Sequence, residues 1–223
     1  MTLTKTQFVA MVDHTLLAAD ATEADVSATV ADAMQLRAAA VCINGCWVAH
    51  ARSLVGDQPV AVCSVIGFPL GAGTSEAKAA EAPDAVANGA SEIDMVVNLG
   101  LLRDRAQEQV VADIAAVRAR LSGDVTLKVI LETAILSDEE IVAGCQAAET
   151  AGADFVKTST GFHAAGGAST HAVELMAHTV DGRLGVKASG GIRTLADVVS
   201  VVDAGATRLG MSATLAVAAE LGT

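Results

Sequence analysis

Residues 125–157 read VTLKVILETAILSDEEIVAGCQAAETAGADFVK. The first eight, 125–132, are rich in Val, Leu and Ile, which is typical of a strand buried on both faces. Ser137-Asp138-Glu139-Glu140 caps a helix predicted to run to Ala151, and Gly152 suits the left-handed conformation that ends a helix. A second short strand, 154–157, follows at once. The segment therefore predicts two parallel strands joined by a helix.

The same alternation of strand and helix recurs along the whole chain. We expect strands at residues 8–12, 41–44, 60–68, 92–98, 125–132, 154–157, 184–187 and 208–211. Helices are expected at residues 22–38, after 44 to about 55, and at 75–88, 103–121, 137–151, 170–179, 194–203 and from 212 onward. Gly89, Gly152 and Gly205 stand at equivalent helix-to-strand joints.

Eight units of about 28 residues predict an α/β fold, a single (β/α)8 TIM barrel with a short N-terminal extra segment. No linker or low-complexity tract interrupts the sequence, so residues 1–223 are expected to form one domain. An open doubly wound sheet explains the alternation equally well, but it gives no reason for eight similar units.

Composition excludes several classes of partner. Apolar residues make up 52% of the chain and aromatic residues 2%, so the core must consist of Ala, Val, Leu and Ile. The net charge of −12 argues against nucleic acid or an anionic membrane, although backbone N–H groups could still hold a small anion. The four cysteines show no C-x-x-C spacing, and we expect reduced thiols in a cytoplasmic protein without signal peptide or membrane span.

The lysines are placed unusually. Only five occur, and three of them, Lys128, Lys157 and Lys187, stand inside short apolar runs that resemble buried strands. Burying an ammonium group costs several kcal/mol unless the protein compensates it. A desolvated amine beside another cation is, however, a common arrangement for an amine that attacks carbonyl carbons.

Other reactive side chains accompany these lysines at the expected ends of strands, where barrel enzymes form their active sites. They are Asp13, Cys42, Asp94, Asn98 and Glu132. Each alone is most simply explained as a member of a structural ion pair, but a convergence of lysines and carboxylates in one pore favours function. Near pH 7 a nucleophilic lysine needs its neutral form favoured by about 4 kcal/mol. We expect Lys187 to supply like-charge repulsion on Lys157, and Asp94 to balance the remaining cation and relay protons through water.

A second pattern predicts a phosphate site. Ser189-Gly190-Gly191 follows the seventh strand, and Gly210-Met211-Ser212 follows the eighth. Loops after these two strands often bind phosphate in barrels, whereas glycine pairs elsewhere usually mark only a tight turn. The histidines show no metal-binding spacing, and no nucleotide-binding motif is present, so neither a metal nor a cofactor is expected.

The motifs resemble those of the deoxyribose-phosphate aldolases, which are class I aldolases. The matching segments are Asp13–Leu17, Val41–Asn44, Gly67–Gly71, Glu92–Asn98, Leu127–Thr133, Phe155–Phe162 and Val186–Thr194. This resemblance implies a Schiff-base lysine at Lys157, a neighbouring cation at Lys187 and a proton-relay carboxylate at Asp94. It also places Gly190, Gly191 and Ser212 in loops that hold phosphate, and we expect further substrate or phosphate contacts from Gly161, Ser189 and Gly210. Supporting polar contacts are expected from Asp13, Thr15, Cys42, Asn44, Lys128 and Thr158.

The sequence departs from the family pattern at three points. Gly45-Cys46 could loosen the turn after the second strand, Met211 is bulkier than expected, and the chain has no tyrosine to assist proton transfer.

The resemblance implies reversible cleavage of 2-deoxy-D-ribose 5-phosphate to acetaldehyde and D-glyceraldehyde 3-phosphate. Expected partners are therefore a sugar phosphate and short aldehydes, with an Ala-rich exterior that favours a homo-oligomer, either dimer or tetramer. Two alternatives stay open. One is an isomerase or synthase that uses lysine as a general acid, and the other is a sugar-phosphate binding protein without activity.

Overall fold

Eight parallel strands close into a barrel, in which each strand pairs with the next and β8 pairs back with β1. This computed structural model describes residues 3–222. The strands are β1 (Val12–Leu16), β2 (Ala40–Ile43), β3 (Ala61–Ile66), β4 (Glu92–Val96), β5 (Thr126–Ile130), β6 (Phe155–Lys157), β7 (Gly185–Ser189) and β8 (Arg208–Met211). The predicted (β/α)8 TIM barrel is confirmed, and the open sheet is excluded because no strand is left at an edge.

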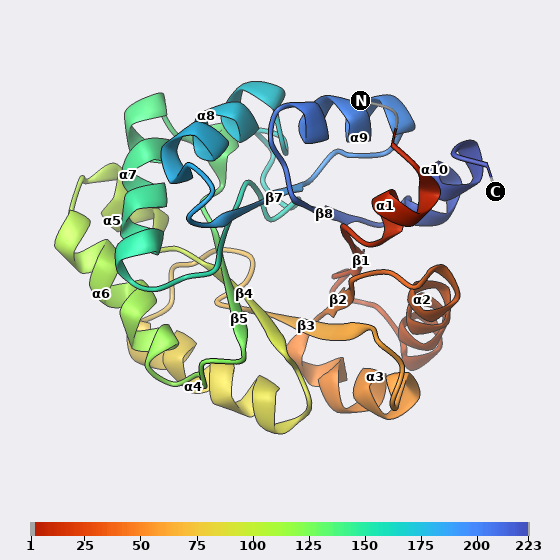
Figure 1. The fold of residues 1–223 in the computed structure, drawn as a ribbon. Helices are drawn as coiled ribbons and strands as arrows, with labels where there is room; N and C mark the ends of the chain where they lie inside the picture. The colour runs from red at the N-terminus through yellow and green to blue at the C-terminus, as the bar shows by residue number, and fades with distance from the viewer. Residues whose placement is uncertain (1–2, 223) are drawn as a thin grey trace.

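Helices surround the barrel, as Figure 1 shows. They are α1 (Lys5–Val9), α2 (Glu23–Leu36), α3 (Val48–Val55), α4 (Ser75–Ala87), α5 (Leu99–Arg103), α6 (Gln107–Arg118), α7 (Asp138–Thr150), α8 (Thr170–Val180), α9 (Leu195–Asp203) and α10 (Thr214–Glu220), with 3-10 turns η1 (Gly45–Trp47) and η2 (Thr133–Ile135). Thr22 and Ser137 form capping boxes at the starts of α2 and α7, as predicted. Gly89, Gly152 and Gly205 have φ values of +107°, +80° and +111°, which confirms the left-handed joints.

Two predicted elements are wrong. The run 8–12 does not form a strand, because Thr4 and Gln7 make a capping box that starts α1, and β1 begins only at Val12. Helix α1 is the short N-terminal extra segment and lies beside α10 (Figure 1). The predicted helix 103–121 is wrong at its start: α5 already ends at Arg103, Arg105 has a φ of +57°, which an α-helix cannot contain, and α6 begins only at Gln107.

Both faces of the strands are buried, but different types of residue lie on each face. In β4, Ile93 and Met95 belong to the large apolar core between the strands and the helices, while Glu92 and Asp94 alternate with them and point into the barrel. The candidate residues inside the strands, such as Asp94 and Lys128, therefore lie in mid-strand in the pore. The sequence had placed them at the strand ends.

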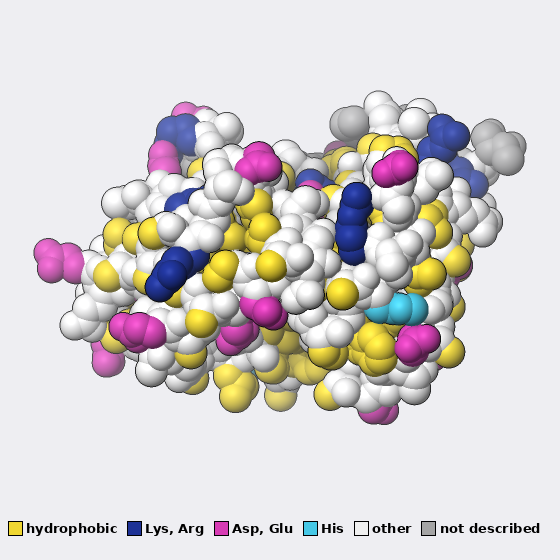
Figure 2. All heavy atoms as spheres, turned by 90° about the horizontal axis from the view of Figure 1, so that it is seen from below, with side chains coloured by type: hydrophobic (Ala, Val, Ile, Leu, Met, Phe, Trp, Pro, Cys, Tyr) yellow, Lys and Arg dark blue, Asp and Glu magenta, His cyan; other side chains and the backbone are white. Residues whose placement is uncertain are grey.

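The surface is mixed in charge. Figure 2 shows acidic and basic side chains scattered over one face of the molecule, without a continuous basic patch. Among residues 3–222, no helix has the length and apolar character needed to cross a bilayer.

Candidate active site

An ionic cluster fills the barrel interior, and Asp94 is at its centre. Lys157 Nζ and Lys187 Nζ each lie 2.7 Å from Asp94 Oδ2, so the two nitrogens are no farther apart than the sum of these distances. Lys128 Nζ binds the other oxygen, Oδ1, at 2.9 Å. Lys187 also forms a short ion pair with Asp13. Three of the five lysines thus converge on one buried carboxylate inside the barrel.

Mutual pairing keeps Asp94 and Lys187 charged despite burial. Burial alone would raise the pKa of Asp94, but Lys128, Lys157 and Lys187 outweigh it and hold that pKa well below its usual range. Burial would likewise lower the pKa of Lys187, but the carboxylates of Asp13 and Asp94 raise it above the ordinary lysine value. Lys187 is therefore a permanent cation beside Lys157.

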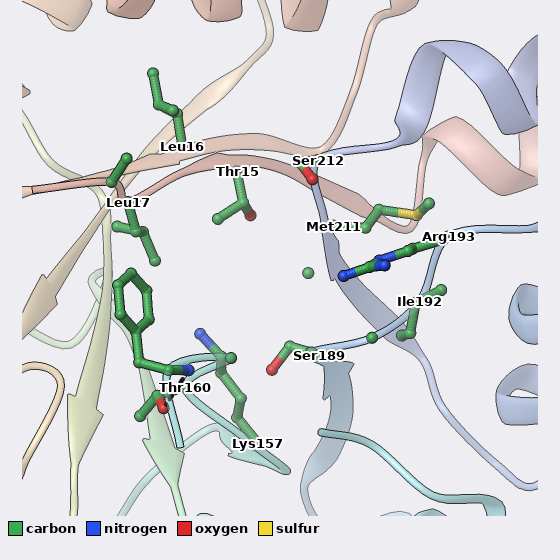
Figure 3. Close-up of a pocket in the computed structure, with 16 residues that line it drawn as sticks. Thr15, Leu16, Leu17, Lys157, Thr160, Ser189, Ile192, Arg193, Met211 and Ser212 are labelled. Carbon is green, nitrogen blue, oxygen red and sulfur yellow. Dashed lines mark hydrogen bonds between the residues drawn. The ribbon is translucent and has the colours of Figure 1, made fainter. Parts of the chain in front are cut away.

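A cavity of about 330 Å³ opens above this cluster at the C-terminal ends of the strands. Figure 3 shows the Lys157 amine pointing into it from one side and the Arg193 guanidinium from another, with Thr15, Ser189 and Ser212 around the same space. All six residues predicted for substrate or phosphate binding line the cavity: Gly161, Ser189, Gly190, Gly191, Gly210 and Ser212. The structure therefore brings the reactive amine and the glycine-rich loops to one space.

The loops that line the cavity pack closely on each other. Gly190 has a φ of +85°, and a Cβ atom added to Gly167 would lie 2.1 Å from the Gly190 carbonyl oxygen, so only glycine fits at 167. Ala168 N–H donates to the carbonyl of Gly190 (3.0 Å), which joins the loop after β6 to the loop after β7. Gly191 also has positive φ (+81°), but nothing lies within 4 Å of its added Cβ.

Three of the residues predicted to make supporting polar contacts either line the cavity or bind residues that line it. Thr15 lines the cavity and donates to the carbonyl of Asp13 (2.7 Å). Thr158 exchanges hydrogen bonds with the backbone of Ser189 at 3.1 and 3.0 Å, which fixes the start of the β7 loop. Asn44 does not line this cavity, but donates from Nδ2 to the carbonyls of Leu17 (3.3 Å) and Ala18 (3.4 Å), two residues that do.

Cys42 is fully buried in a small apolar cluster with Cys63, and a hydrogen bond from Cys63 lowers the pKa of Cys42. Two groups of possible metal ligands lie in the pore among the described residues: Cys42, Cys63 and Asp94, and Asp13, Cys63 and Glu92. The lysine ammonium groups bind the same carboxylates, so a cation there would have to displace them.

Two of the departures from the family pattern can be located in the structure. Gly45 and Cys46 form η1, in which Trp47 N–H donates to the carbonyl of Asn44 (3.0 Å), so this turn is closed. Met211 is 4% exposed and contributes to the cavity wall.

Four charged residues of the structure were not predicted from the sequence as part of the site or as buried ion pairs. Arg193 follows the Gly190-Gly191 pair and lines the cavity, where a guanidinium suits an anion. Glu92 and Arg208, the first residues of β4 and β8, complete the ionic cluster from below. Lys78 on α4 is a fourth buried lysine, which pairs outside the pore with Asp113 at 2.5 Å. Glu92 and Arg193 lie within segments that match the family, whereas Arg208 and Lys78 bind partners that are distant in sequence.

Fold and site together define a class, a (β/α)8-barrel enzyme with a lysine amine in the wall of its cavity. Comparison with known proteins identifies the family within this class. The profile of the DeoC/LacD family aldolases matches residues 8–219. The chain therefore belongs to the DeoC/LacD aldolase family.

The relatives agree with this family. A deoxyribose-phosphate aldolase of Mycobacterium avium (strain 104) is 54% identical over 226 residues, which cover 100% of both chains. That of Corynebacterium diphtheriae is 52% identical, covering 98% of this chain and 99% of the relative. The tetrameric structure of deoxyribose phosphate aldolase from Aeropyrum pernix superimposes with a TM-score of 0.91 at 33% identity, covering 98% of this chain and 92% of that one.

Proposed function

We propose that the chain reversibly cleaves 2-deoxy-D-ribose 5-phosphate to acetaldehyde and D-glyceraldehyde 3-phosphate through a Schiff base on Lys157. The observation that carries the proposal is the shared Asp94 oxygen, which holds the amine of Lys157 next to the permanent cation Lys187 at the floor of the cavity. Relatives that cover nearly the whole chain at more than half identity are named for this reaction, and they support the assignment of substrate.

Each step follows from the groups present. The neutral amine of Lys157 attacks C1 of the open-chain sugar, and loss of one water gives an iminium. A base removes the proton of the C3 hydroxyl, the C2–C3 bond breaks, and its electrons pass to the iminium nitrogen to give an enamine. Glyceraldehyde 3-phosphate leaves. Protonation of the enamine at C2 and hydrolysis by one water then release acetaldehyde and restore the amine.

Asp94 fits two roles in this sequence. Its low pKa keeps a negative charge beside the nitrogen that becomes the iminium, which stabilises that cation. With a bound water it also passes the proton from the C3 hydroxyl to the enamine carbon. The sequence contains no tyrosine that could assist this proton transfer.

The opposite wall of the cavity suits the 5-phosphate. Backbone N–H groups of Gly190, Gly191 and Ser212 and the guanidinium of Arg193 are donors of the kind that phosphate accepts. We also propose a homo-oligomer in the cytoplasm, supported by the tetrameric relative from Aeropyrum pernix and by the Ala-rich exterior.

Borohydride trapping tests the assignment. Incubation with acetaldehyde and borohydride should add the mass of an ethyl group to the peptide that contains Lys157, and aldehyde release from deoxyribose 5-phosphate should be lost in Lys157→Ala. The other four lysines, Lys5, Lys78, Lys128 and Lys187, serve as internal controls in the same peptide map. An adduct on any of them instead, or no adduct on wild type, would refute the role of Lys157.

A further inference from the structure

Glu92 and Arg208 form an ion pair on the side of the pore away from the cavity. Arg208 Nη2 lies 3.2 Å from Glu92 Oε1, and Nη1 lies 2.8 Å from Asp13 Oδ1. Glu92 Oε2 lies 2.5 Å from Lys128 Nζ. Both residues begin their strands, so they lie below Asp94 and do not line the cavity. They connect with Lys157 only through other charged groups.

Every strand contributes a titratable or charged side chain to this pore. They are Asp13, Cys42, Cys63, Glu92, Asp94, Lys128, Lys157, Lys187 and Arg208, taken from β1 to β8 in order. Leaving the two thiols aside, four are basic and three are acidic. Such a buried cluster is electrically neutral when one basic group is unprotonated, and low dielectric penalises any surplus charge.

Lys157 has the fewest carboxylate partners of the four basic groups. Among the carboxylates of residues 3–222, Lys128 contacts three, Lys187 and Arg208 contact two each, and Lys157 contacts only Asp94. Lys157 is also the one that lines the cavity.

We propose that Glu92 and Arg208 are positioning residues whose opposite charges set the fraction of Lys157 present as the free amine. The proposal rests on the Schiff-base role proposed for Lys157. Loss of the negative charge at 92 makes the cluster more positive, which disfavours a proton on Lys157. Loss of the positive charge at 208 makes it more negative, which favours that proton. The two charges act on Lys157 at a distance, in opposite senses.

Two variants that each remove one charge test these signs. In Glu92→Gln, the acid limb of the pH profile of kcat/KM should move to lower pH, and in Arg208→Gln to higher pH, each by about one pH unit. The double variant should return close to the wild-type profile. The pH dependence of borohydride trapping on Lys157 should shift in the same directions, because it reports the free amine without turnover.

Controls separate charge from folding. Arg208→Lys keeps the charge but loses the forked contact, so its profile should stay near that of wild type even if its melting temperature falls. Repeating the two variants in a Cys42→Ser background removes the pore thiol whose pKa is lowered, and the opposite shifts should persist.

The outcomes are distinct for the two proposals. Shifts of both single variants in one direction, or unchanged profiles in folded proteins, would overturn the positioning role. A wild-type protein that gives no adduct on Lys157 would overturn the proposed function instead.

Discussion

Lys157 and Lys187 share one oxygen atom, Oδ2 of Asp94, at 2.7 Å each. The arrangement joins a reactive amine, a permanent cation and a carboxylate in a space with almost no exposed surface. Both oxygens of Asp94 are engaged, because Lys128 binds Oδ1. Asp94 therefore cannot rotate toward one lysine without leaving another unpaired, and the amine of Lys157 is held in one orientation.

Lys187→Leu should lower kcat/KM by about 100-fold or more, with a slower rate of trapping on Lys157. Carboxylates raise the pKa of Lys187, so the wild-type residue is a cation at neutral pH. Its removal leaves Asp13 and Asp94 with fewer cations and favours a proton on Lys157, so the acid limb of the profile should also move to higher pH.

The matched control for this variant is Lys5→Leu, which removes the same side chain from helix α1 outside the pore. Its profile and trapping rate should match those of wild type. A Lys187→Leu enzyme that keeps the wild-type pH profile would contradict the electrostatic role of Lys187.

Arg193→Leu should raise KM for deoxyribose 5-phosphate by about 10- to 100-fold, the loss expected for a hydrogen bond between charged groups. The guanidinium lines the cavity across from Lys157, where the 5-phosphate would lie (Figure 3). Unphosphorylated 2-deoxyribose should react at nearly the same rate with the variant and the wild type.

Arg183→Leu supplies the comparison, since Arg183 is exposed on another part of the surface and pairs with Glu149. Steady-state kinetics with both sugars measures the effect. An equal loss with both sugars would show that Arg193 acts on the fold of the loop and not on phosphate.

The barrel could be predicted from the sequence because local signals agree with it. Glycines at 89, 152 and 205 end helices where a strand must follow, and the capping boxes at Thr22 and Ser137 start helices at the predicted residues. The break at Arg105 could not be predicted, because no glycine or proline marks it. Arg105 lies between α5 and α6, which contact each other.

The candidate site likewise contains residues that could be predicted from the sequence and residues that could not. Lys157, Lys187 and Asp94 could be predicted because a charge within an apolar run is visible in one segment. Arg208 and Lys78 were missed, because their meaning depends on partners far away in sequence. Asp13 is 195 residues from Arg208, and Asp113 is 35 residues from Lys78.

Lys78→Met should lower the free energy of unfolding by about 3 to 5 kcal/mol, the usual cost of leaving one member of a buried ion pair alone. Lys78 Nζ contacts Asp113 Oδ2 and the carbonyls of Gly71 and Val96, so it joins α4 to α6 and to the end of β4. Denaturant unfolding measures the loss.

The double variant Lys78→Met/Asp113→Leu should recover much of that stability, because no buried charge is left unpaired. Borohydride should still label Lys157 in the single variant under conditions where it is folded. Loss of labelling in a folded Lys78→Met protein would show that Lys78 belongs to the catalytic machinery.

Stability should fall as the pH drops below about 6.5, because His14 is buried. Its Nδ1 lies 2.9 Å from Thr214 Oγ1, which joins β1 to the start of α10. Burial lowers the pKa of His14 below 6.5, and Asp32, at 3.9 Å from Nε2, offsets this only in part. The unfolded chain therefore binds a proton more readily than the folded chain. The contribution of His14 is complete above pH 6.5 and is lost as the pH falls through the folded-state pKa.

His14→Gln should make the melting temperature less dependent on pH between 7 and 5.5, because glutamine is polar like histidine but does not titrate. His163→Gln, on an exposed loop, should keep the wild-type slope. Thermal melts at half-unit steps of pH measure the three slopes. Equal slopes for wild type and His14→Gln would mean that other groups carry the proton uptake, whereas a flatter slope in His14→Gln alone assigns it to the contact between β1 and α10.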